Sequence, residues 1–270
     1  MAPDLLKRFN VRISGAGEPT IVFAHGFGCD QQMWRYVVPA FEAEHRVVLF
    51  DYLGMGGADR ASYDPQRYTR LDAYAEDMVA LGEALQLRGA VLIAHSVSAM
   101  IGALAAIRAP TMFSRLVMVA PSPRYLNDDG YVGGFDRAVI DDVLAMMDRN
   151  DFGWAGSLAS TVMRNPDRPE LTGELHDSFC AVDPVVARCF AEATFNSDNR
   201  ADLPHVPVPS LILQCSDDAV APESVGRYLH AHLPASTFRK LPATGHCPHM
   251  SHPQETIAAI RDYLAPATRA

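Results

Sequence analysis

Residues 90–108 read AVLIAHSVSAMIGALAAIR, and this stretch decides the fold class. Its first five residues form a nearly continuous apolar run, which is typical of a strand buried on both faces of a parallel sheet. Residues 97–108 have the length and the alanine content of a helix. Ser96 stands between the two segments with small residues on either side. The stretch therefore predicts a strand, a sharp turn and a helix, with a serine at the turn.

Similar apolar runs recur along the chain, each followed by turn residues. They lie at 20–24, 46–50, 116–120 and 210–214, with a last strand expected at 237–241. A helical pattern at 71–87 lies between two of these runs. Strands that alternate with helices are typical of a doubly wound α/β sheet, which binds ligands at the carboxyl ends of its strands. We therefore expect an α/β core made from residues 1–120 and 208–270.

The alternation stops over residues 121–207, where the pattern predicts helices and no strand. Four helical segments are expected, at 136–150, 152–163, 170–181 and 183–196. Each of their aromatic and Met side chains, taken alone, fits a packed core equally well. Taken together, they favour a helical lid inserted over an apolar cavity, because ligand pockets are lined mainly by hydrophobic side chains.

Composition and charge exclude several classes of protein. The chain has 270 residues, of which 49% are hydrophobic and 20% charged, as in a globular enzyme of about one domain. A net charge of -9 has the wrong sign for a nucleic acid or an anionic membrane as partner. No apolar run reaches the roughly 18 residues that a membrane span needs, and no secretory signal is found. We therefore expect a cytoplasmic protein.

The cysteines are odd in number and scattered, with no CxxC pair. This spacing predicts free thiols rather than a disulfide framework or a zinc site. Cys247 is of interest because it follows a histidine that has a candidate role in catalysis. The five are Cys29, Cys180, Cys189, Cys215 and Cys247.

Three segments carry residue types that suit nucleophilic catalysis. The pentapeptide around Ser96 is a variant of the G-x-S-x-G nucleophile elbow, although a serine there can also simply cap the helix. A serine hydroxyl needs a base, and His246 is favoured over His249 and His252 because it follows a glycine directly after the last strand. A carboxylate must orient the base. It is expected at the end of strand 210–214, where spacing alone does not choose between two candidates, Asp217 and Asp218.

The order serine, aspartate, histidine along the chain resembles that of the α/β-hydrolase superfamily. In that family the acid commonly stands four residues before a proline, and this implies Asp218, which precedes Pro222. The family also implies an oxyanion hole made by two backbone amides. On the motif His25-Gly26-Phe27-Gly28 and on the elbow, these are the amides of Phe27 and Val97.

Longer strings resemble one subgroup of that family, the RsbQ-like proteins related to the karrikin and strigolactone receptors. They include HGFGCDQQMW at 25–34, AHSVSAMIG at 94–102 and GHCPHMSHP at 245–253, with Ala94 where the elbow often has glycine. The resemblance implies a mostly parallel sheet with a four-helix lid inserted after the sixth strand. It also implies the triad Ser96, Asp218 and His246 and a binding pocket made by Phe27, Tyr125, Phe135, Trp154 and Phe195.

Two functions follow from the residues and the resemblance together. The first is a serine hydrolase of a small hydrophobic ester or lactone that works through an acyl-enzyme. The second is a small-molecule receptor with slow or vestigial hydrolysis, which regulates a partner phosphatase in a stress response. Neither needs a metal or an organic cofactor. The glycine cluster at 54–57 lacks the full G-x-G-x-x-G pattern of a dinucleotide site.

Overall fold

The computed structural model describes residues 2–149 and 152–265 and contains one seven-stranded sheet. The strands lie in the order β1-β3-β2-β4-β5-β6-β7, and every neighbouring pair is parallel except β1 with β3. This confirms the predicted α/β class. The strand bounds are β1 Arg12–Ser14, β2 Ile21–Ala24, β3 Val47–Leu49, β4 Ala90–His95, β5 Phe113–Val119, β6 Ser210–Asp217 and β7 Ser236–Thr244.

Strand β1 was not among the expected strands. It has only three residues, all exposed or half-exposed, and it pairs antiparallel at the edge of the sheet. An edge strand of this kind carries no apolar run, and for that reason no pattern in the sequence indicates it.

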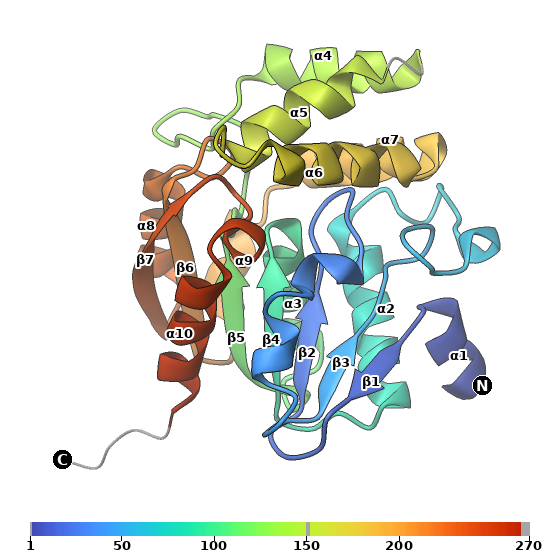
Figure 1. The fold of residues 1–270 in the computed structure, drawn as a ribbon, viewed down its shortest axis with the longest axis vertical. Coiled ribbons are helices and arrows are strands. Elements are labelled where there is room, and N and C mark those ends of the chain that lie inside the picture. Colours follow the sequence, from blue (N-terminus) through green and yellow to red (C-terminus); the bar gives the residue numbers. More distant parts are fainter. Residues whose placement is uncertain (1, 150–151, 266–270) are drawn as a thin grey trace.

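Helices cover both faces of the sheet and its upper edge (Figure 1). The α-helices are α1 Ala2–Arg8, α2 Leu71–Ala84, α3 Val97–Arg108, α4 Arg137–Asp148, α5 Gly153–Met163, α6 Pro169–Ala181, α7 Pro184–Phe195, α8 Glu223–His232, α9 Pro248–Ser251 and α10 Pro253–Leu264. Four short 3₁₀ helices are η1 Gln31–Trp34, η2 Val38–Ala40, η3 Arg60–Ser62 and η4 Arg200–His205. None of the described helices is long and apolar enough to cross a lipid bilayer.

The central strand β4 shows why its sequence is apolar throughout. Leu92 and Ala94 pack into a core beneath α2, α3 and α8, whereas Val91 and Ile93 pack into a second core with α10 and η1. Alternate side chains of a strand point to opposite faces, so a strand covered on both faces must be apolar at every position. Burial on both faces fixes the position of the end of β4. His95 is the last residue of this strand, and Ser96 comes directly after it.

Helices α4–α7 lie between β5 and β6 in the chain and extend across the edge of the sheet toward which the parallel strands point (Figure 1). The helices begin and end close to the expected positions, and Asn150, the expected end of the first, lies outside the described residues. The insertion follows the fifth strand, not the sixth as the resemblance implies. Only five strands precede it because residues Ala2–Arg8 form a helix and β1 is the one strand before β2.

Candidate active site

Ser96 occupies a strained turn between β4 and α3. Its backbone has φ +56° and ψ -123°, a conformation that L-residues adopt only where the surrounding structure imposes it. The side chain makes no capping hydrogen bond to the helix, so the alternative in which Ser96 merely caps α3 does not fit. Instead, Oγ lies 2.7 Å from Nε2 of His246.

His246 is held between the hydroxyl of Ser96 and a carboxylate. Its Nδ1 lies 2.7 Å from Oδ2 of Asp218, which accepts the proton of Nδ1 and leaves Nε2 to accept the Ser96 hydroxyl. The backbone N–H of His246 donates to the carbonyl of Val162 at the end of α5. The preceding Gly245 has φ +85°, and a Cβ there would lie 2.0 Å from the carbonyl oxygen of Met163. Only glycine therefore lets this loop lie against the helical insertion.

Geometry distinguishes the two adjacent aspartates. Asp218 is 7% exposed, and its Oδ1 accepts the backbone N–H groups of Val220 and Ala221 at 2.8 and 3.0 Å. Asp217 points outward, is half exposed and pairs with Arg164 at 3.2 Å. The structure thus brings Asp218, and not Asp217, to the histidine.

Two backbone amides remain available near the nucleophile. Val97 is the first residue of α3, and the first N–H groups of a helix have no acceptor within it. The amide of Phe27, in the loop after β2, likewise donates no hydrogen bond within the described part of the chain. Amides in these positions suit the stabilisation of an oxyanion.

A small apolar cavity lies above Ser96. Its volume is about 30 Å³, room for only one or two water molecules. Three of the five residues expected to form the pocket line it, namely Phe27, Tyr125 and Phe195. The other lining residues are Cys29, His95, Ser96, Leu158, Val162, Leu175, Phe179, Thr194, Val220, His246 and Cys247.

Phe135 and Trp154 are not among the residues that line this cavity. Trp154 stacks on Phe179, with ring centroids 5.8 Å apart, and Phe135 contacts Phe195 edge-on at 5.9 Å. Both therefore pack behind the residues that line the cavity. Aromatic character alone does not predict which residues line the cavity and which pack behind them.

Tyr125 makes a contact that sequence reasoning did not anticipate. Its hydroxyl lies 3.1 Å from Oγ of Ser96. Because Oγ donates to His246, the tyrosine must be the donor in this bond. Burial raises the pKa of Tyr125, so the hydroxyl keeps its proton at neutral pH. Oγ of Ser96 is thus held by two hydrogen-bond partners, His246 and Tyr125.

A second cluster of polar side chains, also missed, lies behind the triad. His95 donates from Nε2 to the backbone carbonyl of His246 at 2.9 Å. Burial lowers the pKa of His95 well below its usual range and that of His249 to about 3, so both imidazoles are neutral. Burial likewise raises the pKa of the Cys247 thiol. These are the residues in the described part of the chain whose ligand atoms could hold a metal ion together.

Comparisons with known proteins show the family to which the chain belongs. The model of the alpha/beta hydrolase family matches residues 21–260. The chain is 38% identical over 256 residues to the karrikin insensitive 2 receptor CA of Petunia hybrida, covering 94% of this chain and 95% of the receptor. It is 36% identical over 262 residues to the strigolactone esterase of Arabidopsis thaliana, covering 97% of this chain and 98% of the esterase.

A solved structure is similar over nearly the whole chain. It is that of a hydrolase from Oleispira antarctica, with a TM-score of 0.95 and 40% sequence identity. The match covers 97% of this chain and 96% of the hydrolase. The insertion of helices α4–α7 and the seven-stranded sheet are included in this coverage.

Proposed function

The chain belongs to the alpha/beta hydrolase family, and from that premise we propose that it is a serine hydrolase of small, neutral, apolar carboxylic esters or lactones. One observation carries the proposal. Hydrogen bonds of 2.7 and 2.7 Å link Asp218, His246 and Ser96 into an unbroken chain beneath an apolar cavity. This is the arrangement that activates a serine hydroxyl for attack on an acyl group.

Each of the three hydrogen-bonded residues has a chemical task in this proposal. Oγ of Ser96 attacks the carbonyl carbon, and Nε2 of His246 takes the hydroxyl proton and then returns it to the leaving oxygen. Asp218 holds the imidazole in the required tautomer and stabilises its cationic form. The amides of Phe27 and Val97 stabilise the oxyanion. A water molecule activated by His246 then hydrolyses the acyl-enzyme by the same steps in reverse.

The lining of the cavity limits the substrate class. It contains no Lys or Arg among the described residues that could pair with an anionic substrate. Burying an unpaired carboxylate in such a cavity costs several kcal/mol, while each buried CH₂ contributes about 0.8 kcal/mol. Neutral apolar esters are therefore favoured. Because the cavity is so small, residues 121–207 are proposed to act as a lid that must shift to admit any ester larger than a few atoms.

The proposal is tested by kcat/KM for p-nitrophenyl esters of matched size with neutral or anionic acyl groups. We expect a preference of at least about 100-fold for the neutral members, the effect of roughly 2.7 kcal/mol of unpaired charge. The variant Ser96→Ala supplies the background rate. Equal use of neutral and anionic esters would contradict the apolar cavity, and hydrolysis that persists in Ser96→Ala would contradict the nucleophile.

The small volume of the cavity also supports a second candidate function. A site with room for one or two waters has to change shape to bind a ligand, and one of the similar proteins is named as a receptor. In this candidate the ligand is turned over slowly, and movement of α4–α7 presents a surface to a protein partner such as a regulatory phosphatase. A cytoplasmic location, expected from the sequence, remains a prediction.

Kinetics separate the two candidates. A hydrolase releases product repeatedly, so steady-state turnover should continue well beyond one equivalent of p-nitrophenol. A receptor should release a burst of at most one equivalent of p-nitrophenol. The steady-state rate after the burst should be slower than the burst by at least about 100-fold, because acyl transfer or release is then limiting. Loss of the burst in Ser96→Ala ties either result to the triad.

A further inference from the structure

Behind the triad, the side chains of His95, Cys247 and His249 meet in the protein interior. They are 3%, 1% and 0% exposed. One ligand atom from each residue lies within 4.8 Å of the other two. On one edge of this triangle, Sγ of Cys247 is 3.9 Å from Nε2 of His95.

The polar atoms of this cluster are unusually poor in partners. Buried ring nitrogens nearly always find a hydrogen bond. Within the described residues, however, neither nitrogen of His249 has a partner, and Nδ1 of His95 has none. The ring of His249 instead packs against the rings of His95 and Trp34, each with centroids 4.5 Å apart. His249 thus has a lone pair that nothing in the described chain uses. In His95 the unused nitrogen is Nδ1, whereas Nε2, the nitrogen next to the thiol, carries the proton donated to the carbonyl of His246.

From this arrangement we propose that His95, Cys247 and His249 bind copper(I) in a three-coordinate site. With metal–sulfur and metal–nitrogen bonds of about 2.3 and 2.1 Å, two ligands at a trigonal angle lie about 3.8 Å apart. The observed 3.9 Å between Sγ and Nε2 nearly meets this requirement. The other edges must close by at most about 1 Å, a movement within reach of side-chain torsions.

Charge and coordination number favour copper(I) over zinc. A thiolate and two neutral imidazoles balance a monovalent cation, whereas a divalent cation would leave a net positive charge in a buried site. Zinc also prefers four ligands, and the cluster supplies three. Thiolate and imidazole are both ligands that copper(I) accepts.

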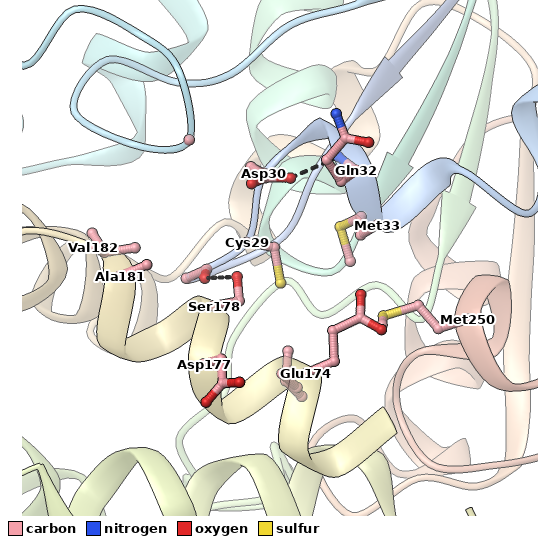
Figure 2. Close-up of a pocket in the computed structure, with 13 residues that line it drawn as sticks. Cys29, Asp30, Gln32, Met33, Glu174, Asp177, Ser178, Ala181, Val182 and Met250 are labelled. Carbon is pink, nitrogen blue, oxygen red and sulfur yellow. Dashed lines mark hydrogen bonds between the residues drawn. The ribbon is translucent and has the colours of Figure 1, made fainter. Parts of the chain in front are cut away.

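A pocket of about 370 Å³ offers a route for a soft cation from the surface (Figure 2). Figure 2 shows the thiol of Cys29 and the thioethers of Met33 and Met250 directed into it. Sulfur atoms of this kind are soft ligands. Three carboxylates lie around its mouth, and Arg35, which pairs with one of them at 2.6 Å, offsets part of their charge. The carboxylates are those of Asp30, Glu174 and Asp177.

The route continues from this pocket to the cluster. Cys29 lines both the pocket of Figure 2 and the cavity above Ser96. That cavity is in turn lined by His95 and Cys247. In the proposed route a cation passes Cys29 and then meets His95 and Cys247, two of the three proposed ligands.

Binding has a consequence for hydrolysis, which rests on the proposed function. As the copper–sulfur bond forms, Cys247 releases its proton to solvent, with no change in oxidation state. Nε2 of His95, which now donates to the carbonyl of His246, becomes a ligand, and its proton moves to Nδ1. The loop that carries the catalytic base then loses this hydrogen bond. Copper(I) is therefore an inhibitor of the hydrolase.

The test is an anaerobic titration of the whole protein with copper(I), in competition with the chromophoric chelator bicinchoninate. We expect one equivalent to be withdrawn from the chelator, and Cys247→Ser to weaken binding by at least about 100-fold. X-ray absorption of the unmodified protein should show one sulfur and two nitrogen ligands, a readout that needs no variant to fold. Two sulfur ligands, no sulfur ligand or tighter binding of Zn²⁺ than of copper(I) would overturn the assignment.

The chain provides a matched control. Sγ of Cys180 lies 3.6 Å from Nε2 of His176 on the outer part of α6, a second thiol–imidazole pair. Cys180→Ser should keep both the one-to-one binding and the basal hydrolysis. If this variant loses copper(I) while Cys247→Ser retains it, the proposed site is wrong. A loss in Cys29→Ser equal to that in Cys247→Ser would also overturn the three-ligand set.

Hydrolysis of a neutral p-nitrophenyl ester provides the second readout. The copper(I)-loaded protein should work at less than about one tenth of the rate of the free protein, and removal of the metal by the chelator should restore activity. Unchanged activity with one bound equivalent would overturn the inhibition. A metal-free protein that hydrolyses no ester would count against the proposed function, whereas the stoichiometry and ligand set would still decide the metal site.

Discussion

His246 lies in the loop after β7, and His249 lies three residues further on, in α9. Both are buried, but their ring nitrogens have opposite surroundings. Both nitrogens of His246 are hydrogen-bonded, one to Asp218 and one to Ser96. Both nitrogens of His249 are without a partner in the described chain. Two clusters are therefore adjacent. In the first, Asp218, His246 and Ser96 hydrogen-bond to one another. In the second, formed by His95, Cys247 and His249, most ring nitrogens have no hydrogen-bond partner in the described chain.

The difference shows how the fold separates positioning from packing. Each hydrogen bond in the triad fixes an orientation, and breaking one leaves a buried group unsatisfied. The ring of His249 is fixed only by contacts with other rings. Its ring stays neutral because burial disfavours the charged form and so lowers the pKa of His249. Substitutions on the triad side should therefore alter chemistry, and those on the far side should alter the response to protons or metal.

The largest contrast is expected between two nearby serines, Ser96 in the turn before α3 and Ser98 in the helix. Ser96→Ala should lower kcat by about 10³- to 10⁶-fold, because the hydroxyl bonded to His246 is lost. Ser98→Ala instead removes a hydroxyl that donates to the carbonyl of His25 and accepts from Tyr52. It should cost about 1 kcal/mol of stability and keep most of the activity.

Labelling with a serine-directed phosphonate, followed by peptide mass spectrometry, checks the same contrast without relying on turnover. The label should be found on Ser96, be absent in Ser96→Ala and persist in Ser98→Ala. A label on Ser98 would break the comparison, since it would place the reactive group outside the hydrogen-bonded chain.

The next effect concerns the neighbouring aspartates. Asp218→Asn presents an amide to Nδ1 of His246 and so disfavours the required tautomer, which should reduce ester hydrolysis by about 10⁴-fold. Asp217→Asn removes only a surface ion pair with Arg164 and should change the rate by less than about tenfold. Steady-state rates of the two variants, with equal folding shown by circular dichroism, decide the matter. The reverse order of effects would contradict the assignment of Asp218.

Low pH should destabilise the protein through its buried neutral histidines. Burial lowers the pKa of His25, His95 and His249, the last to about 3, whereas the unfolded chain binds these protons near pH 6.5. Their contribution to stability is complete above pH 6.5 and is lost as the pH falls toward the folded-state values. Each such histidine adds a slope of about 1.4 kcal/mol per pH unit to the free energy of unfolding.

Urea unfolding between pH 7 and pH 5 measures this slope. His249→Phe should keep the ring contacts and reduce the slope below pH 6.5 by about one proton. An identical slope in the variant would show that the His249 ring takes up a proton in the folded state. That result would remove the distinction drawn between the two histidines.

The sequence predicted those parts of the site that depend on local patterns in the chain. Strand ends, the elbow and a glycine-flanked histidine are local patterns, and they are sufficient to indicate Ser96 and His246. The choice of Asp218 over Asp217 needed the resemblance to a family, because adjacent residues in a turn share the same spacing. The four inserted helices followed from the loss of strand patterns over residues 121–207.

The remainder depends on packing between distant segments. His95, Cys247 and His249 meet only because the end of β4 converges with Cys247 and the adjoining helix α9, and the cysteine spacing gives no sign of it. The same limit applies to the lid, where Phe195 lines the cavity and Phe135 lies behind it, although both are aromatic. In both examples the position of a side chain depends on the space around it and on the direction in which it points, and residue type alone gives neither.

The smallest effect is expected at Tyr125, the second hydrogen-bond partner of Ser96 Oγ. Its hydroxyl donates to Oγ of Ser96 at 3.1 Å, and a hydrogen bond to Oγ makes its lone pair less available for attack. A bond of this kind is worth about 0.5 to 1.5 kcal/mol, so Tyr125→Phe should raise kcat/KM for a neutral p-nitrophenyl ester by about two- to tenfold. The phosphonate should label the variant faster by a similar factor, because that reaction uses the same oxygen. A decrease of more than tenfold in both rates would instead show that the tyrosine stabilises the transition state, and the triad side of the molecule would then contain a fourth polar group with a chemical task.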